Sequence, residues 1–328
     1  MYRLGYFYVV VFVLLLTACG PKGATNSTDQ VVVIATLKGP SAISMVKMMQ
    51  TIDTLAAKTV EFRLVDEPLQ VRKMMMQKEV DMAVLPSTMG ALLYNKGVNY
   101  QLAAIPVWGT LYLFGTDTTI GTWEDLRGKR IHLMARGMTP DIVFRHLLEA
   151  HGLDAKASVS LDYSFPTHID LANAVLANRA SLAVLSEPMV SMVKARNKRV
   201  QPLFDLNAEW NHVHKDTLPM AQTALLVEAA FGAKNKQWMK QFLTVYKESL
   251  NWVNEHPELA APYIVEQRIL PDEQVAEEAI PGCNMALKAT DAIKNQLRAY
   301  FQLFYHENPA IIGGKMPDEQ FYYIPTHP

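Results

Sequence analysis

Short apolar runs alternate with amphipathic segments along most of the chain, and the same order occurs in both halves. Each run is followed by a segment whose apolar positions recur three and four residues apart, as in a helix packed on one face. The runs stand at 31–37, 60–65, 83–85, 130–135, 157–163 and 183–185. Alternating strands and helices predict a mostly parallel sheet with helices on both faces, once in each half.

One phrase shows the repeat most clearly. The sequence AVLPSTM stands at Ala83–Met89, and AVLSEPM stands at Ala183–Met189. In both copies an apolar run breaks into a small polar cluster, and a helix-like segment follows. The repetition indicates a duplicated β-α-β-α-β-α unit and therefore two lobes.

The C-terminal third does not repeat. It contains one more strand candidate at 222–228, and helical segments at 235–255, 257–267, 272–280 and 289–307. Because the second copy lies between Tyr112 and Asp205, we expect it to be inserted into the first lobe. The predicted fold is a two-lobed α/β architecture joined by two hinge strands, near 102–114 and 202–206 or 217–227. The predicted lobes are 31–110 with 207–328 (lobe I), and 111–206 (lobe II).

Four strand-to-helix turns occupy matching places in the two copies. Ligands of such sheets bind beyond the carboxyl ends of the strands, where helix N-termini carry unpaired N–H groups and partial positive charge. The four turns are therefore candidates for a site that holds a small polar or anionic ligand, although each also suits an ordinary helix cap. The turn residues are Gly39, Pro40, Ser41, Ser87, Thr88, Gly137, Met138, Thr139 and Glu187.

Two aromatic residues lie at the expected crossing between the lobes. Trp108 and Tyr112 are candidates for stacking on a flat ligand, and packing at the hinge is the competing interpretation.

The N-terminus carries a targeting signal. After Tyr2-Arg3 comes Leu4–Leu16, an apolar stretch of 13 residues that has the length of a signal-peptide core and is short for a spanning helix. It ends in LTACG at 16–20, which resembles the lipobox of bacterial lipoproteins. We expect a signal peptide at 1–18, a lipidated, palmitate-type Cys19 and a polar tether at 19–30; a plain signal peptide or an uncleaved anchor are the alternatives. The predicted location is the cell envelope, on a membrane and facing the periplasm or the exterior.

Several functional classes receive little support. The formal net charge of −1 gives no reason to expect nucleic acid. No GxGxxG, phosphate-binding loop or GxSxG motif occurs, so no catalytic residue and no cofactor is expected. His212 and His214, or His146 with Glu149 and His151, lack a convincing third and fourth ligand, and no metal is expected. If Cys19 carries lipid, Cys283 has no disulfide partner and is expected to be buried.

Several segments resemble one family. WEDLRGKRI at Trp123–Ile131 resembles the segment that opens the second lobe of type II periplasmic solute-binding proteins. The turns at 137–140 and 87–88 look like that family's ligand-side turns. Ala279–Met285 and Gly313–Tyr323 resemble elements of the nitrate, sulfonate and thiamine-precursor binders of ABC importers. The resemblance extends over Val31–Pro325.

The resemblance implies a monomeric, non-catalytic binder. It would capture a small polar, anionic or heterocyclic solute between its lobes and deliver it to an ABC permease with its ATPase. None of the four turns contains Arg, the usual bidentate partner of an oxyanion, although Lys38 and Arg136 precede two of them. Two alternatives are an enzyme on the same scaffold, of the thiamine-precursor or menaquinone-pathway type, and a binder that feeds a sensor.

Overall fold

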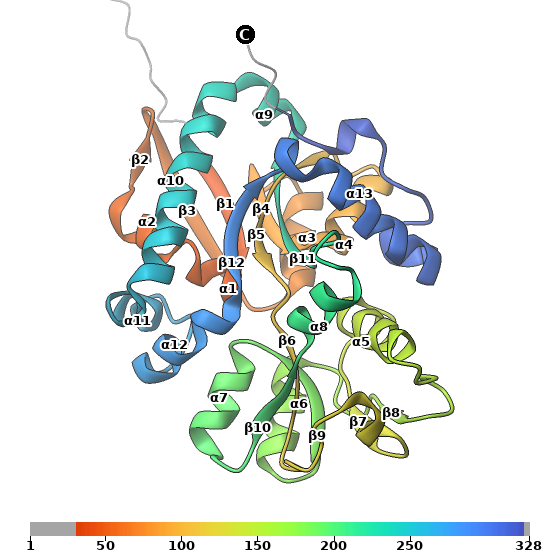
Figure 1. Cartoon of the computed structure of the whole chain (residues 1–328). Helices are drawn as coiled ribbons and strands as arrows, with labels where there is room; N and C mark the ends of the chain where they lie inside the picture. The colour runs from red at the N-terminus through yellow and green to blue at the C-terminus, as the bar shows by residue number, and fades with distance from the viewer. Residues whose placement is uncertain (1–30, 325–328) are drawn as a thin grey trace, which may run out of the picture.

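The computed structural model describes residues 31–324, and the signal peptide, Cys19 and the tether predicted from the sequence lie outside this range. The chain forms two sheets with flanking helices (Figure 1). The larger sheet has seven strands in the order β12-β5-β11-β4-β1-β3-β2, and the smaller has five in the order β10-β6-β9-β7-β8. The predicted two-lobed α/β fold is confirmed. We call the larger sheet with its helices the large lobe, and the smaller sheet with its helices the small lobe.

The strands come from separate stretches of the chain. The large lobe contains β1 (Val32–Leu37), β2 (Thr54–Leu55), β3 (Lys58–Val65), β4 (Met82–Pro86), β5 (Tyr100–Trp108), β11 (Ala221–Glu228) and β12 (Met285–Ala289). The small lobe contains β6 (Leu111–Gly115), β7 (Arg130–His132), β8 (Ser160–Asp162), β9 (Leu182–Ser186) and β10 (Gln201–Asp205).

The repeat seen in the sequence is also present in the strand order. β1 lies parallel to and between β3 and β4, and β7 lies parallel to and between β8 and β9. In both sheets the next strand is antiparallel: β11 pairs with β4, and β6 pairs with β9. Both sheets are therefore mixed, and not mostly parallel as the sequence predicted, because β11 and β6 run against the repeated strands.

Most helices follow the predicted segments. They are α1 (Pro40–Ile43), α2 (Val46–Thr51), α3 (Pro68–Met76), α4 (Ser87–Asn95), α5 (Thr139–Ala150), α6 (His168–Leu176), α7 (Met189–Arg196), α8 (Leu206–Val213), α9 (Ala229–Lys234), α10 (Lys236–Glu255), α11 (Pro257–Glu266), α12 (Glu273–Ala279) and α13 (Thr290–Glu307). Short 3₁₀ turns are η1 (Trp123–Leu126), η2 (Pro281–Cys283), η3 (Pro309–Ile312) and η4 (Glu319–Phe321). The helical segment after the first apolar run is divided between α1 and α2 at Ser44 and Met45. The Ser44 hydroxyl donates to the Ser41 carbonyl at 2.7 Å and also contacts the Tyr246 hydroxyl at 2.8 Å.

Both faces of the large sheet are covered. Side chains of successive strand residues point to opposite faces, and Val32 and Ile34 belong to a core with Trp238 and Phe242 of α10. Ala35 belongs instead to the core that contains the aromatic residues of α13. Helices on both faces explain why the central strands β1 and β4 are apolar at nearly every position.

Two segments connect the lobes. The chain passes from β5 to β6 through Gly109 and Thr110, and from β10 through α8 to β11. The Gln222 side chain accepts from the Thr110 amide at 2.8 Å and donates to the Thr110 hydroxyl at 2.7 Å. This pairing holds the two connections together. The lobe boundaries at 110/111 and 206/207 stay predictions.

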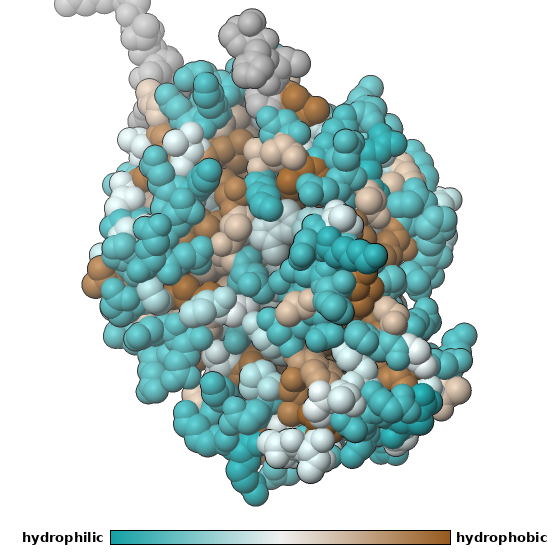
Figure 2. Space-filling model, in the orientation of Figure 1, coloured by the Kyte–Doolittle hydropathy of each residue, from teal (hydrophilic) through white to brown (hydrophobic). Residues whose placement is uncertain are grey.

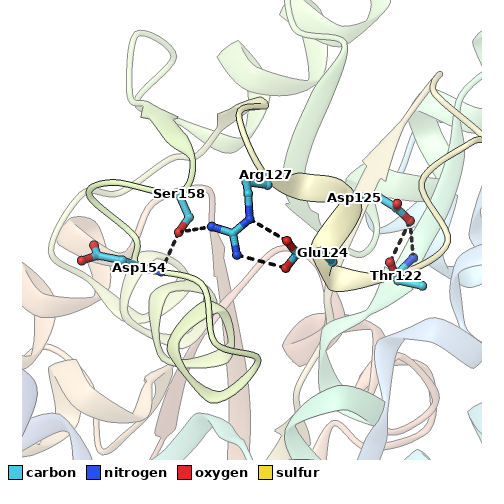
Figure 3. Close-up of polar contacts among 6 residues, drawn as sticks. All are labelled: Thr122, Glu124, Asp125, Arg127, Asp154 and Ser158. Atoms are coloured by element: carbon cyan, nitrogen blue, oxygen red, sulfur yellow. Dashed lines mark hydrogen bonds and ion pairs between the residues drawn. The ribbon is translucent and has the colours of Figure 1, made fainter.

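The WEDLRGKRI segment has a structural role in the small lobe (Figure 3). Thr122 and Asp125 form a capping box at the start of η1. Arg127 donates to both carboxylate oxygens of Glu124, at 2.6 and 3.0 Å, and to the Ser158 hydroxyl at 3.1 Å. Ser158 also accepts from the Asp154 amide at 3.0 Å. These bonds fix the entrance to β7 against the segment that leads to β8.

Hydrophilic residues cover most of the face shown in Figure 2, and hydrophobic surface appears there in small separate areas. No helix within residues 31–324 combines the length and the apolar character that crossing a bilayer requires.

Candidate functional site

The four turns predicted from the repeat meet in two pairs between the lobes. A Cβ atom added to Gly39, in the turn between β1 and α1, would lie 3.7 Å from Cδ of Pro188, in the turn between β9 and α7. The Thr88 hydroxyl, in the first turn of α4, lies 3.0 Å from the Thr139 hydroxyl at the start of α5. Each pair joins one turn of the large lobe to one of the small lobe: the lobes touch at Thr88 and Thr139, and they approach to within one side-chain atom at Gly39 and Pro188.

A cleft of about 490 Å³ opens between the lobes beside the first of these pairs. This volume lies in the range of small-molecule sites, about 300–1,000 Å³. The large lobe contributes the ends of β1 and β4, the start of α3 and the segment after α11; the small lobe contributes α6, the end of β9 and α7. Of the predicted site residues, the cleft is lined by Gly39, Pro40, Ser41 and Glu187.

The other predicted site residues lie outside the lining of the cleft. They are Ser87, Thr88, Trp108, Tyr112, Gly137, Met138 and Thr139. The Ser87 hydroxyl donates to the Ala221 carbonyl at 2.5 Å and thereby holds the start of β11. The Gly137 amide donates to the Asp141 carboxylate at 2.7 Å, so this N–H already has a partner, and the Met138 side chain is exposed.

The two aromatic candidates pack at the hinge. Trp108 is 8% exposed, and its indole N–H donates to the Ala286 carbonyl of β12 at 2.7 Å. Tyr112 is half-buried, and burial together with the negative charges of Asp205 and Glu187 raises the pKa of its hydroxyl. Both rings are therefore placed for hinge packing, the interpretation that competed with ligand stacking.

Glu187 is the buried carboxyl group of the cleft. Its side chain accepts from the Ser191 amide at 3.1 Å and from the Ser191 hydroxyl at 2.9 Å, and its own amide donates to the Thr110 carbonyl at 3.0 Å. Burial raises the pKa of Glu187 from 4.5 to about 7, against the lowering effect of the two bonds from Ser191. The neighbouring Cys283 is a buried free thiol whose pKa is also raised by burial.

Replacing Glu187 with Gln is expected to flatten the pH dependence of stability. Between pH 4.5 and about 7 the unfolded chain loses the Glu187 proton while the folded chain retains it, so stability falls as pH rises. The full difference is on the order of 3 kcal/mol. Urea unfolding at a series of pH values from 4 to 8 measures this change in the free energy of unfolding. Glu277→Gln, at an exposed position, is the control and should keep the wild-type dependence of stability on pH. If Glu187→Gln also keeps that dependence, Glu187 is not the group that causes it.

Two arginines in the wall of the cleft were not anticipated from the sequence. Arg196 ends α7, and Arg268 follows α11 with a positive φ of 54°. Both line the cleft, both are exposed, and neither forms an ion pair with another residue of the described range 31–324. Lys38, also in the lining, is paired with Asp66 at 2.9 Å. Arg136 lies over the Tyr163 ring, 5.2 Å from its centroid, and is not part of the lining.

Neither arginine stands in a sequence pattern that indicates a binding role. Arg196 was visible only as a basic residue in the last turn of a helix, and Arg268 as a residue between two helical segments. In the part of the chain that the structure describes, no group of three or more His, Cys, Asp or Glu side chains is arranged to hold a metal ion.

The fold is shared with solved structures of transport proteins. A crystal structure of an ABC transporter from Parabacteroides distasonis has 28% identity and a TM-score of 0.79, and the match covers 90% of this chain and 99% of that one. The periplasmic aliphatic sulphonate binding protein SsuA from Escherichia coli has 16% identity and a TM-score of 0.73, with 90% and 93% covered. The desulfurization enzyme DSZB shares the fold at 12% identity and a TM-score of 0.61, with 89% and 96% covered.

The sequence also matches a family model. No curated protein matches the chain, but the model described as NMT1/THI5 like matches residues 58–260. This match spans β3 to α11 and so includes strands of both sheets and both connections between the lobes. The chain therefore belongs to the NMT1/THI5-like family.

Proposed function

We propose that this protein is the solute-binding component of an ABC importer. The observation that carries the proposal is the cleft of about 490 Å³ whose walls come from both lobes. A ligand in this position contacts both lobes at once. The structural likeness to an ABC transporter protein at 28% identity over 90% of the chain supports the same role.

The ligand that suits the cleft best is a small molecule with an anionic end. Arg196 and Arg268 supply two positive charges to the lining, and Arg donors recognise planar or tetrahedral oxyanions through charge-assisted hydrogen bonds. The aliphatic sulphonates bound by the SsuA relative belong to this class. The apolar part of the lining, which includes Met189, Met192 and Leu270, suits an organic remainder. This narrows the expected polar, anionic or heterocyclic solute to an organic anion.

Binding is proposed to close the lobes. The structure has the lobes in contact through Thr88 and Thr139 and close together at Gly39 and Pro188, as in a closed state. A ligand that touches both walls favours this state by its higher affinity for it. The closed form then docks on the permease, which acts with its ATPase, and the binder works as a monomer.

A panel of short alkanesulfonates, nitrate, bicarbonate, pyrimidines, flavins and amino acids tests the proposal. A ligand at 100 times its Kd stabilises a protein by about 2.7 kcal/mol, which raises the melting temperature by roughly 5 °C for a chain of this size. Small-angle scattering with the positive compound is expected to show a smaller radius of gyration than without it. A bound compound that leaves the radius unchanged would contradict closure by the ligand.

The anchor is proposed from the sequence. Lipid on Cys19 would hold the binder at a membrane in the cell envelope, facing the periplasm or the exterior. The mass of the detergent-extracted protein is expected to correspond to a chain that starts at Cys19 and carries acyl groups. An unmodified chain that begins elsewhere would exclude this anchor.

A further inference from the structure

Two histidines from separate parts of the sequence meet where α5 packs against α8. His146 lies in α5, and His214 caps the C-terminus of α8. Their Nε2 atoms are 3.1 Å apart, and their rings are nearly parallel, with an interplanar angle of 8° and centroids 5.1 Å apart. Both side chains are half-buried, so the pair is ordered by packing and still open to solvent.

The surrounding residues hold both rings in place. Trp210 of α8 is fully buried, and its ring centroid lies 5.3 Å from that of His146 and 4.5 Å from that of His214. The Trp210 indole N–H donates to the Leu218 carbonyl at 2.5 Å, which fixes the indole itself. The position of the two imidazoles therefore depends on the packing of α5 against α8, and not on flexible surface rotamers alone.

We propose that His146 and His214 form a two-histidine site for a late first-row divalent transition metal ion, Cu²⁺, Ni²⁺ or Zn²⁺. Imidazole nitrogens bind such ions at about 2.0–2.1 Å, which places two neighbouring ligand atoms about 2.9–3.4 Å apart for angles between 90° and the tetrahedral value. The observed separation of 3.1 Å falls within this range. Water or an external ligand completes the coordination.

Burial lowers the pKa of both histidines, and the neutral imidazole is the form that binds a metal ion. The carboxylates of Glu307, at the end of α13, and Glu149, in α5, act on His146 in the opposite direction. Because α13 belongs to the large lobe, the site lies at the junction of the two lobes. An ion held here would cross-link α5 to α8, which leads directly into β11 and the hinge. A hydrogen bond between two neutral imidazoles is the competing explanation of the short distance.

Calorimetric titration of the metal-free, full-length protein with CuCl₂, NiCl₂, ZnCl₂ and MgCl₂ tests the site. We expect one ion per chain, tighter binding of Cu²⁺ than of Ni²⁺ or Zn²⁺, and no binding of Mg²⁺, which prefers oxygen ligands. His146→Gln and His214→Asn should each weaken the Kd at least tenfold. His212→Asn is the matched control, because His212 is exposed and lies two residues from His214 but outside the pair; its Kd should not change.

The electron paramagnetic resonance spectrum of the Cu²⁺ complex gives a second measurement that needs no variant. Coupling to two imidazole nitrogens is expected, and a spectrum without it overturns the proposal. Absence of metal binding by the wild-type chain leaves the hydrogen-bonded pair as the explanation. If the His146→Gln/His214→Asn double variant binds the ion as tightly as the wild type does, the ion binds elsewhere and the proposed site is wrong.

Discussion

Replacing Arg196 and Arg268 together with Gln is expected to weaken the binding of an organic anion, such as a short alkanesulfonate, by about 100-fold or more. Both side chains line the cleft and neither is neutralised by a carboxylate of the described range 31–324. A hydrogen bond to a charged group contributes about 1.5–3 kcal/mol, and each 1.4 kcal/mol corresponds to about tenfold in Kd. Calorimetric titration of wild type and variant with the same sulfonate measures the change.

The control for this experiment removes a charge close to the cleft but outside it. Arg199 is exposed, lies three residues after Arg196 and does not line the cleft, so Arg199→Gln should change the Kd less than twofold. If Arg199→Gln and Arg196→Gln weaken binding equally, the arginines act only through the long-range field. If the double variant binds as tightly as the wild type, the arginines do not contact the solute.

Replacing Trp210 with Ala is expected to reduce the free energy of unfolding by about 3–5 kcal/mol. Trp210 is fully buried in the helix that leads from the small lobe back to β11. Its ring packs edge-on to Tyr300 of α13, with centroids 6.2 Å apart, and its N–H holds the Leu218 carbonyl. The substitution therefore opens a large cavity and leaves a partly buried acceptor without its donor. Urea unfolding of the wild type and the variant measures the loss of stability, provided that the two proteins have the same m value.

Trp252→Ala is the matched control, since it removes the same side chain from a half-buried position. Trp252 lies against His256 and beneath the Lys47 ammonium, which is 4.5 Å from the ring centroid. Part of its surface is already exposed, so a smaller loss of stability is expected, on the order of 1–2 kcal/mol. If both variants lose the same free energy of unfolding, the full burial of Trp210 contributes no more to stability than the partial burial of Trp252.

The repeated elements could be predicted because their local patterns agree with their final surroundings. The strands at β1, β3, β4 and β9 lie where the apolar runs predicted them. α8 was not predicted, because in LNAEWNHV only a few positions are apolar and the pattern is too short to indicate a face. Its position depends on Trp210, which is buried by residues of α13 that lie far away in the sequence. The strand β12 was missed because MALKA is short and apolar at all positions but one, so the sequence shows no alternation, although the burial of its residues does alternate.

The candidate site was predicted in part. The four turns of the duplicated unit were expected to lie together, and the structure pairs non-equivalent turns: Gly39 approaches Pro188, and Thr88 meets Thr139. Which turns line the cleft could not be predicted, since this depends on the angle between the lobes. The binding role of the turn residues stays a prediction.

The sequence by itself determined the duplicated α/β units and the turns that begin their helices, because strand and helix periods and capping residues act over a few neighbouring positions. Only the tertiary structure decided which side chains face the cleft and that His146 meets His214. Those contacts join residues many tens of positions apart, and they depend on how whole helices and lobes pack. No local pattern of hydrophobic and polar residues carries that information.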